Sequence, residues 1–149
     1  MDRKEIALEL RRNGFNCAQA VAVAFSNVLG SDPIHTFKMA EPFGFGLGDG
    51  EDLCGCISAM ALMVGMKKSD GEIENPKTKR QSYRTISTMK EEFRSRVGES
   101  TCRKIKEGNI SCNECIAISC ELLDKYLLGI YPDGEEPDIK VIRNKDAKF

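Results

Sequence analysis

The 149-residue sequence lacks several features that would assign it to a common functional class. It has no tryptophan and a single histidine, and its 22 basic residues do not outnumber its 23 acidic ones. Surfaces that bind nucleic acid or anionic membranes normally carry a basic excess, so neither partner is predicted. No apolar run approaches the roughly 18 residues of a membrane span, so no span is predicted. The charged segment 1–5 lacks the apolar core of a signal peptide, and we expect a cytoplasmic protein.

The motifs of common catalytic and nucleotide-binding sites are also missing. The glycines between Gly44 and Gly50 do not form Gly-x-Gly-x-x-Gly, no strand is predicted before them, and they lack the Gly-Lys-Ser/Thr ending of a phosphate loop. No Ser/His/Asp set or pair of catalytic carboxylates stands out, so no defined substrate reaction is predicted. The lone His35 is expected to be structural rather than a ligand.

Caps, apolar spacing and helix breakers predict an all-α protein, a single-domain bundle of about five to seven helices with a glycine-rich loop. The expected helices span residues 4–12, 17–29, 33–40, 54–66, 76–97, 102–107 and 112–128. The expected caps are Asn16, Asp32, Asp52, Asn75, Ser100–Thr101 and Ser111. The helical domain is expected over residues 1–130. Residues 131–149 would form an extended tail that either packs on a partner chain, giving a homodimer, or is frayed.

Four of the seven cysteines stand where a predicted helix begins: Cys17, Cys54, Cys102 and Cys112. Unpaired N–H groups and the helix dipole favour an anion there, so we expect these thiols to have lowered pKa values and to act as nucleophiles or metal ligands. If the four helix starts converge, they form a pocket suited to several thiolates. An odd number of cysteines in a chain without an export signal favours metal or redox chemistry over a disulfide framework.

The cysteine segments resemble a family of redox-active proteins named for separated cysteines around a Cys-Gly-Ala-x-x-Gly motif. The resembling segments are Asn16–Val21, the glycine loop with Cys54-Gly55, Arg94–Arg103, Cys112 and Glu121–Leu123, which together cover about residues 14–128. The resemblance implies a redox role, and it places the family's four cysteines on Cys17, Cys54, Cys102 and Cys112. A related domain is found in a split-Soret type cytochrome, where an iron–sulfur centre accompanies haem.

The chain departs from the family motif at two positions. Cys56 stands where the family usually has alanine, and Ala59 where it has the second glycine. Cys56, Cys115 and Cys120 are therefore additional thiols, and Cys120 is expected to be a core residue. Covalent haem is not predicted, because the Cys-x-x-Cys at Cys112 is followed by isoleucine instead of histidine.

The leading hypothesis is an iron–sulfur protein for electron transfer or redox sensing. Four thiolates are the ligand set of such clusters, and a [2Fe–2S] centre would be held by Cys17, Cys54, Cys102 and Cys112. The glycines expected to let the backbone approach the cluster are Gly46, Gly48 and Gly55. The electron donor or acceptor is expected to be a partner protein whose identity the sequence does not reveal.

Three other hypotheses stay open at this point, of which the last is an inert helical domain. A thiol–disulfide redox protein without a metal would use the close pairs Cys54/Cys56 and Cys112/Cys115. A structural zinc module would bind its ion through four thiolates. Structural zinc sites usually contain two Cys-x-x-Cys-like pairs, and this chain has one.

Overall fold

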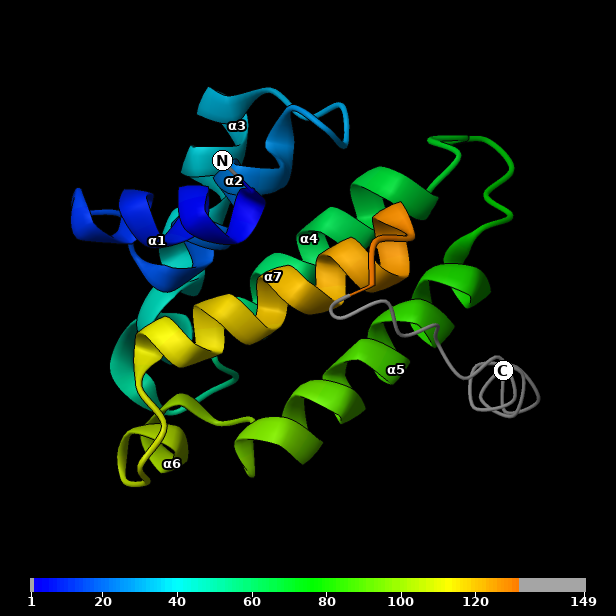
Figure 1. The fold of residues 1–149 in the computed structure, drawn as a ribbon. Coiled ribbons are helices and arrows are strands. Elements are labelled where there is room, and N and C mark those ends of the chain that lie inside the picture. The colour runs from blue at the N-terminus through cyan, green and yellow to red at the C-terminus, as the bar shows by residue number, and fades with distance from the viewer. Residues whose placement is uncertain (1, 132–149) are drawn as a thin grey trace.

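The computed structural model describes residues 2–131, and this part of the chain is all-α, as predicted (Figure 1). Its helices are α1 (Arg3–Arg12), α2 (Cys17–Ser26), α3 (Pro33–Ala40), α4 (Gly55–Lys68), α5 (Lys79–Val97), α6 (Cys102–Lys106) and α7 (Cys112–Leu128). Two short segments, η1 (Glu41–Phe43) and η2 (Gly46–Gly50), lie between α3 and α4. Apart from its first residue, the predicted tail lies outside the described residues.

Three of the predicted caps are confirmed by side-chain hydrogen bonds. The side chains of Asn16, Asp32 and Ser111 accept from backbone N–H groups in the first turns of α2, α3 and α7, at 2.9, 2.9 and 3.1 Å. Gln19 completes a capping box on α2, because its side chain accepts from the Asn16 N–H at 3.1 Å. These local signals fix the start of two helices that begin with a cysteine.

Two predicted helix bounds are wrong by three residues, and the others differ by two residues at most. The longest helix, α5, begins at Lys79 instead of Pro76, since the preceding loop folds back and the Asp70 N–H donates to the Thr78 hydroxyl at 3.3 Å. Residues 71–77 are exposed, so a helix there would have no packing partner to stabilise it. Helix α2 ends at Ser26 instead of Leu29, although the turn that follows does close at Gly30, which has a φ of 78°.

The core is built around α2 and α4. In α2 the alanines Ala18, Ala20 and Ala22 are fully buried, and their small size lets α1, α3, α4 and α7 approach the helix closely. Helix α4 packs against α2, α5 and α7, and its buried side chains include Met60 and Met63. In Figure 1, α4, α5 and α7 run alongside one another, and α1 to α3 gather at one end of this group.

Ion pairs on the outer faces hold α1 and α5 against α7. Glu121 of α7 pairs with Lys4 at 3.4 Å and with Arg96 at 2.7 Å, and Asp124 pairs with Arg3 at 3.0 Å. Pairs at the protein surface contribute about 0–1 kcal/mol each in the median, and these are only half-buried, so apolar burial dominates the stability of the bundle. Within residues 2–131, no helix is both long and apolar enough to cross a membrane.

Candidate functional site

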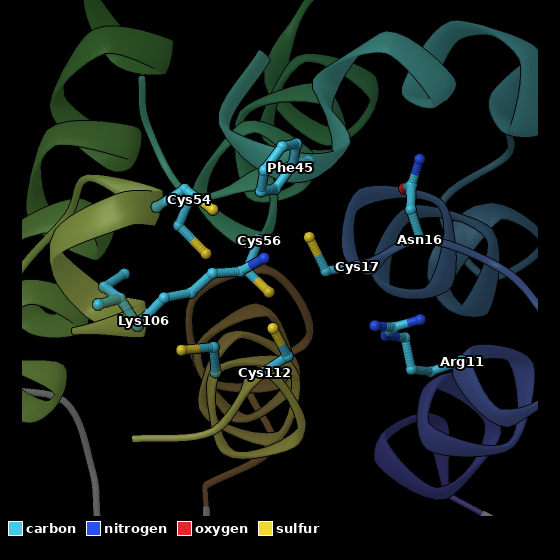
Figure 2. Close-up of a pocket in the computed structure, with 11 residues that line it drawn as sticks. Arg11, Asn16, Cys17, Phe45, Cys54, Cys56, Lys106 and Cys112 are labelled. Carbon is cyan, nitrogen blue, oxygen red and sulfur yellow. The ribbon is translucent and has the colours of Figure 1, made fainter. Parts of the chain in front are cut away.

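Six of the seven cysteines line one pocket of about 110 Å³, where α2, α4, α6 and α7 begin (Figure 2). They are Cys17, Cys54, Cys56, Cys102, Cys112 and Cys115. The remaining lining residues are Arg11, Asn16, Phe45, Ile105 and Lys106. The four cysteines predicted as ligands therefore converge, and two further thiols, Cys56 and Cys115, lie with them.

Cys17 and Cys112 occupy the positions that their caps predict. Each is the first residue of a capped helix, and both side chains are partly exposed at the pocket. One turn into α7, Cys115 lies on the same helix face as Cys112, as residues three apart do, and it is only 2% exposed. One helix start thus supplies two thiols to the pocket.

Cys54 and Cys102 are brought together by backbone pairing that the sequence does not signal. The Cys54 N–H donates to the Ser100 carbonyl at 2.8 Å, and the Cys102 N–H donates to the Asp52 carbonyl at 2.9 Å. These two bonds flank the bridge between Leu53 and Thr101.

The prediction that Asp52 caps the helix at Cys54 is wrong. The backbone pairing at Leu53 holds this segment outside the helix, the Asp52 side chain is exposed, and Cys54 itself precedes α4 as its cap residue, without a side-chain hydrogen bond. The cap predicted at Ser100–Thr101 has the right position, but the expected side-chain hydrogen bond is missing. Thr101 holds the cap position of α6, but its side chain makes no cap hydrogen bond.

Four thiols of the pocket influence one another's ionisation. Cys54 is influenced by Cys17, Cys56 and Cys115, and Cys17 also by Cys56. Two backbone N–H groups also contribute, since that of Phe45 favours the Cys17 thiolate and that of Cys56 favours the Cys54 thiolate by lowering the pKa of each. All seven cysteines are free thiols.

The neighbouring thiols shift one another's pKa values in opposite directions: that of Cys54 is lowered, and those of Cys17 and Cys56 are raised. The hydrogen bond with Cys115 acts to raise the pKa of Cys54, but those with Cys17 and Cys56 outweigh it, and the pKa of Cys54 is lowered. The hydrogen bond with Cys54 raises the pKa of Cys17. Hydrogen bonds with Cys17 and Cys54, together with burial, raise the pKa of Cys56 well above its usual range. Of Cys17, Cys54 and Cys56, Cys54 therefore has the lowest pKa and ionises most readily.

Burial raises the pKa of Cys102, although the neighbouring ammonium of Lys106 favours its thiolate. The expectation of lowered pKa values at helix starts is thus wrong for Cys17 and Cys102. Desolvation and thiol–thiol contacts outweigh the helix start at both positions. Cys120 is fully buried in α7 and does not line the pocket, which confirms that it is a core residue.

The predicted glycines differ in what they approach. A Cβ on Gly55 would lie 2.7 Å from the Cys17 sulfur, and a Cβ on Gly46 would lie 2.6 Å from the Cys102 Cβ. Both glycines therefore allow close packing against a predicted ligand. A Cβ on Gly48 would have no neighbour within 4 Å, and its φ of 93° is what favours glycine there. None of the three lines the pocket itself, and their role toward a cofactor stays a prediction.

Sequence reasoning missed Phe45, Lys106 and Arg11 as pocket residues. Phe45 and Leu47 have φ values of 52° and 64°, a left-handed conformation that costs a side-chain-bearing residue about 1–2 kcal/mol. This turn directs the Phe45 N–H at Cys17 and places the Phe45 ring 4.3 Å from the Lys106 Nζ. Strained backbone beside a cluster of thiols is typical of functional sites. The run of glycines around Phe45 was the one sequence signal for it.

Within residues 2–131, no group of three or more histidine, cysteine or acidic side chains is arranged to hold a single metal ion. His35 is exposed and lies outside the pocket, and its N–H donates to the Asp32 cap. The donors available at the site are therefore thiols alone.

The fold and the pocket define an all-α protein with a redox-capable thiol site. The chain belongs to the family described as "Putative redox-active protein (C_GCAxxG_C_C)", whose model matches residues 15–126 and so spans all seven cysteines. The family pattern has its glycine directly before its cysteine, so in this chain it matches Gly55-Cys56. The prediction that the motif runs Cys-Gly and places the family's second cysteine on Cys54 is therefore wrong: Cys56 takes that place, and Cys54 is the additional thiol. Both line the pocket. No curated protein and no solved structure matches the chain.

Proposed function

We propose that this redox-active protein binds an iron–sulfur cluster, a [2Fe–2S] centre, in the thiol pocket and acts in electron transfer or redox sensing. The observation that supports the proposal is the convergence of Cys17, Cys54, Cys102 and Cys112 from four helix starts on one pocket. When bound, the cluster would accept and release a single electron without the making or breaking of a bond to substrate.

The donor chemistry of the pocket fits such a group. Thiolates are the ligands of iron–sulfur clusters, and six thiols are available to supply four. In a [2Fe–2S] centre each iron takes two protein ligands, so no three sulfurs have to point at one ion. This requirement is compatible with a pocket that is not arranged for a single metal ion. A volume of about 110 Å³ has room for several atoms, since a water molecule needs only about 10–15 Å³ by the same measure.

The surroundings also suit a negatively charged group. The backbone N–H groups of Phe45 and Cys56 favour the thiolates of Cys17 and Cys54, and N–H groups that stabilise charge on the ligands of a cluster raise its reduction potential. Cys54 and Cys102 are 7% and 8% exposed, so their sulfurs are largely shielded from water. Phe45 and Cys56 would stabilise the charged ligands, and the burial of Cys54 and Cys102 would limit the access of water to the cluster.

The test is the composition and visible spectrum of protein purified without oxygen. The proposal expects broad absorption between about 400 and 500 nm, together with iron and acid-labile sulfide in equal amounts. A colourless, iron-free protein after reconstitution with ferrous iron and sulfide would overturn it. Stoichiometric zinc in a colourless protein would instead support the structural zinc hypothesis.

Thiol–disulfide exchange is the second candidate, and the presence of Cys17, Cys54 and Cys56 in one pocket, where they shift one another's pKa values, favours it. The thiol with the lowered pKa, Cys54, is the nucleophile, and its neighbours are close enough to resolve a mixed disulfide. Attack of the Cys54 thiolate on a disulfide releases one thiolate, and a second attack by Cys17 or Cys56 releases the other and leaves a protein disulfide. Mass mapping after oxidation by a small disulfide would then find one reversible bond among these three cysteines.

A further inference from the structure

The charged side chains that line the thiol pocket are all cationic. Arg11 and Lys106 are the two charged residues among the lining residues, and no carboxylate of residues 2–131 lines the pocket with them. Arginine and lysine are positively charged at neutral pH. The formal charges that line the pocket are therefore positive, although the chain as a whole has a net charge of −1.

The two cations stand at different sides of the cysteines. Figure 2 shows Lys106 extending from α6 past Cys54 and Cys112 toward Phe45, while Arg11 comes from α1 beside Cys17 and Asn16. Both residues are exposed, and each is held in place. The Lys106 Nζ lies 4.3 Å from the centre of the Phe45 ring, and the Arg11 Nη1 donates to the Phe15 carbonyl at 3.3 Å.

We propose that Arg11 and Lys106 make this pocket selective for small anionic sulfur compounds, such as thiols and disulfides that bear carboxylates. The thiols supply the reactivity toward sulfur, and the two cations raise the local concentration of anions in a recess with apolar walls at Phe45 and Ile105. Cationic reactants are disfavoured by the same field. The selectivity is a property of the pocket itself and holds whether its thiols bind a cluster or exchange disulfides.

Two probes of opposite charge and equal chemistry test this selectivity. They are sulfonatoethyl methanethiosulfonate, an anion, and trimethylammonioethyl methanethiosulfonate, a cation. In both reactions a cysteine thiolate attacks the sulfenyl sulfur, a disulfide forms, and methanesulfinate leaves with the electron pair of the broken bond. Because both probes react with the same thiolate, the pKa of a cysteine affects both rates equally and does not change their ratio.

The full-length chain would be prepared without iron and reduced, and labelling of the pocket cysteines would be followed by peptide mass. Rates are normalised to those of a free small thiol. In the unmodified chain the normalised rate with the anionic probe exceeds the normalised rate with the cationic probe, so that their ratio is above one. Arg11→Gln and Lys106→Gln each lower the ratio by about three- to tenfold, and added salt lowers it in the unmodified chain. Lys106→Glu lowers it further.

Matched controls come from neighbouring cations outside the pocket. Arg12→Gln and Lys104→Gln remove exposed charges next to the two lining residues, and the ratio stays within twofold of the unmodified chain. Lys106→Arg keeps the charge and the ratio, which separates charge from packing. Equal ratios in Arg11→Gln, Lys106→Gln and these controls would overturn the proposal, as would a ratio in the unmodified chain that does not respond to salt.

Discussion

Gly55 and Cys17 are in direct contact where α4 and α2 begin. A Cβ on Gly55 would lie 2.7 Å from the Cys17 sulfur and 2.8 Å from the Phe43 carbonyl oxygen, closer than such contacts normally are. Only a glycine allows the first turn of α4 to approach the first residue of α2 in this way. The glycine of the family motif therefore acts on the pocket by setting the distance between two helix starts.

Gly55→Ala is expected to destabilise the protein by about 1–3 kcal/mol, because the Phe43 carbonyl belongs to the backbone and cannot move away without shifting η1, and the Cys17 sulfur could do so only by rotating out of its position. Gly65→Ala in the same helix is the matched control. Its Cβ would meet nothing within 4 Å, and alanine is a better helix former than glycine by up to about 1 kcal/mol. Urea unfolding of both variants measures the difference. Equal free energies of unfolding in the two variants would contradict the contact.

The parts of the site that the sequence predicts are those fixed by local signals. Asn16 and Ser111 are followed by helices that begin at Cys17 and Cys112, as the capping pattern requires. Cys115 could also have been placed in the pocket, since it lies three residues after Cys112 on a helix. The sequence assigned it only to a close thiol pair.

The parts that the sequence could not predict depend on contacts between distant segments. Asp52 looks like a cap, but its carbonyl accepts from the Cys102 N–H, the Cys54 N–H donates to Ser100, and α4 begins only at Gly55. The raised pKa values of Cys17 and Cys102 follow from burial and neighbouring thiols, which no capping rule contains. The left-handed turn at Phe45 is likewise a product of packing, because its conformation is unfavourable locally.

Ser111→Ala is expected to reduce the free energy of unfolding by about 1 kcal/mol, within the usual range of about 0.5–2 kcal/mol for a lost cap. The hydroxyl accepts from the Glu114 N–H at 3.1 Å, and alanine leaves that N–H without a protein partner. Thr101→Ala is the control, because Thr101 occupies the cap position of α6 without a side-chain hydrogen bond. Denaturant unfolding should show a change within about 0.5 kcal/mol for that variant. A larger loss in Thr101→Ala than in Ser111→Ala would contradict the capping geometry.

Cys120 is expected to make the protein less stable in alkaline solution. Burial raises its pKa far above the ordinary cysteine value, so the folded chain keeps the proton that the unfolded chain loses above about pH 8.5. Below that pH both states are protonated and the contribution is fully present. Above it, unfolding releases a proton, and the free energy of unfolding falls by up to about 1.4 kcal/mol per pH unit.

Cys120→Ala removes this term and leaves the other thiols unchanged. Urea unfolding between pH 8 and 10.5 should therefore give a shallower decline for Cys120→Ala than for the unmodified chain, with the difference growing from about pH 8.5 upward. At pH 7 the variant is expected to be less stable by about 1 kcal/mol, because the side chain of a fully buried residue is shortened. Parallel pH profiles would show that Cys120 ionises equally in both states.

Serine variants in matched pairs are expected to separate the cluster ligands from the other pocket thiols. Cys54→Ser and Cys112→Ser should each abolish the visible absorption and the bound iron, because serine does not supply a thiolate. The matched variants Cys56→Ser and Cys115→Ser change a neighbouring sulfur at the same helix start and should retain the absorption and the iron.

Cys17→Ser and Cys102→Ser should lose the absorption and the iron, as Cys54→Ser and Cys112→Ser do. Cys120→Ser, in the core, should retain the cluster. An intact spectrum in two of the four ligand variants would overturn this ligand set. Loss of disulfide exchange in Cys56→Ser, in a chain that binds no iron, would favour the thiol mechanism instead.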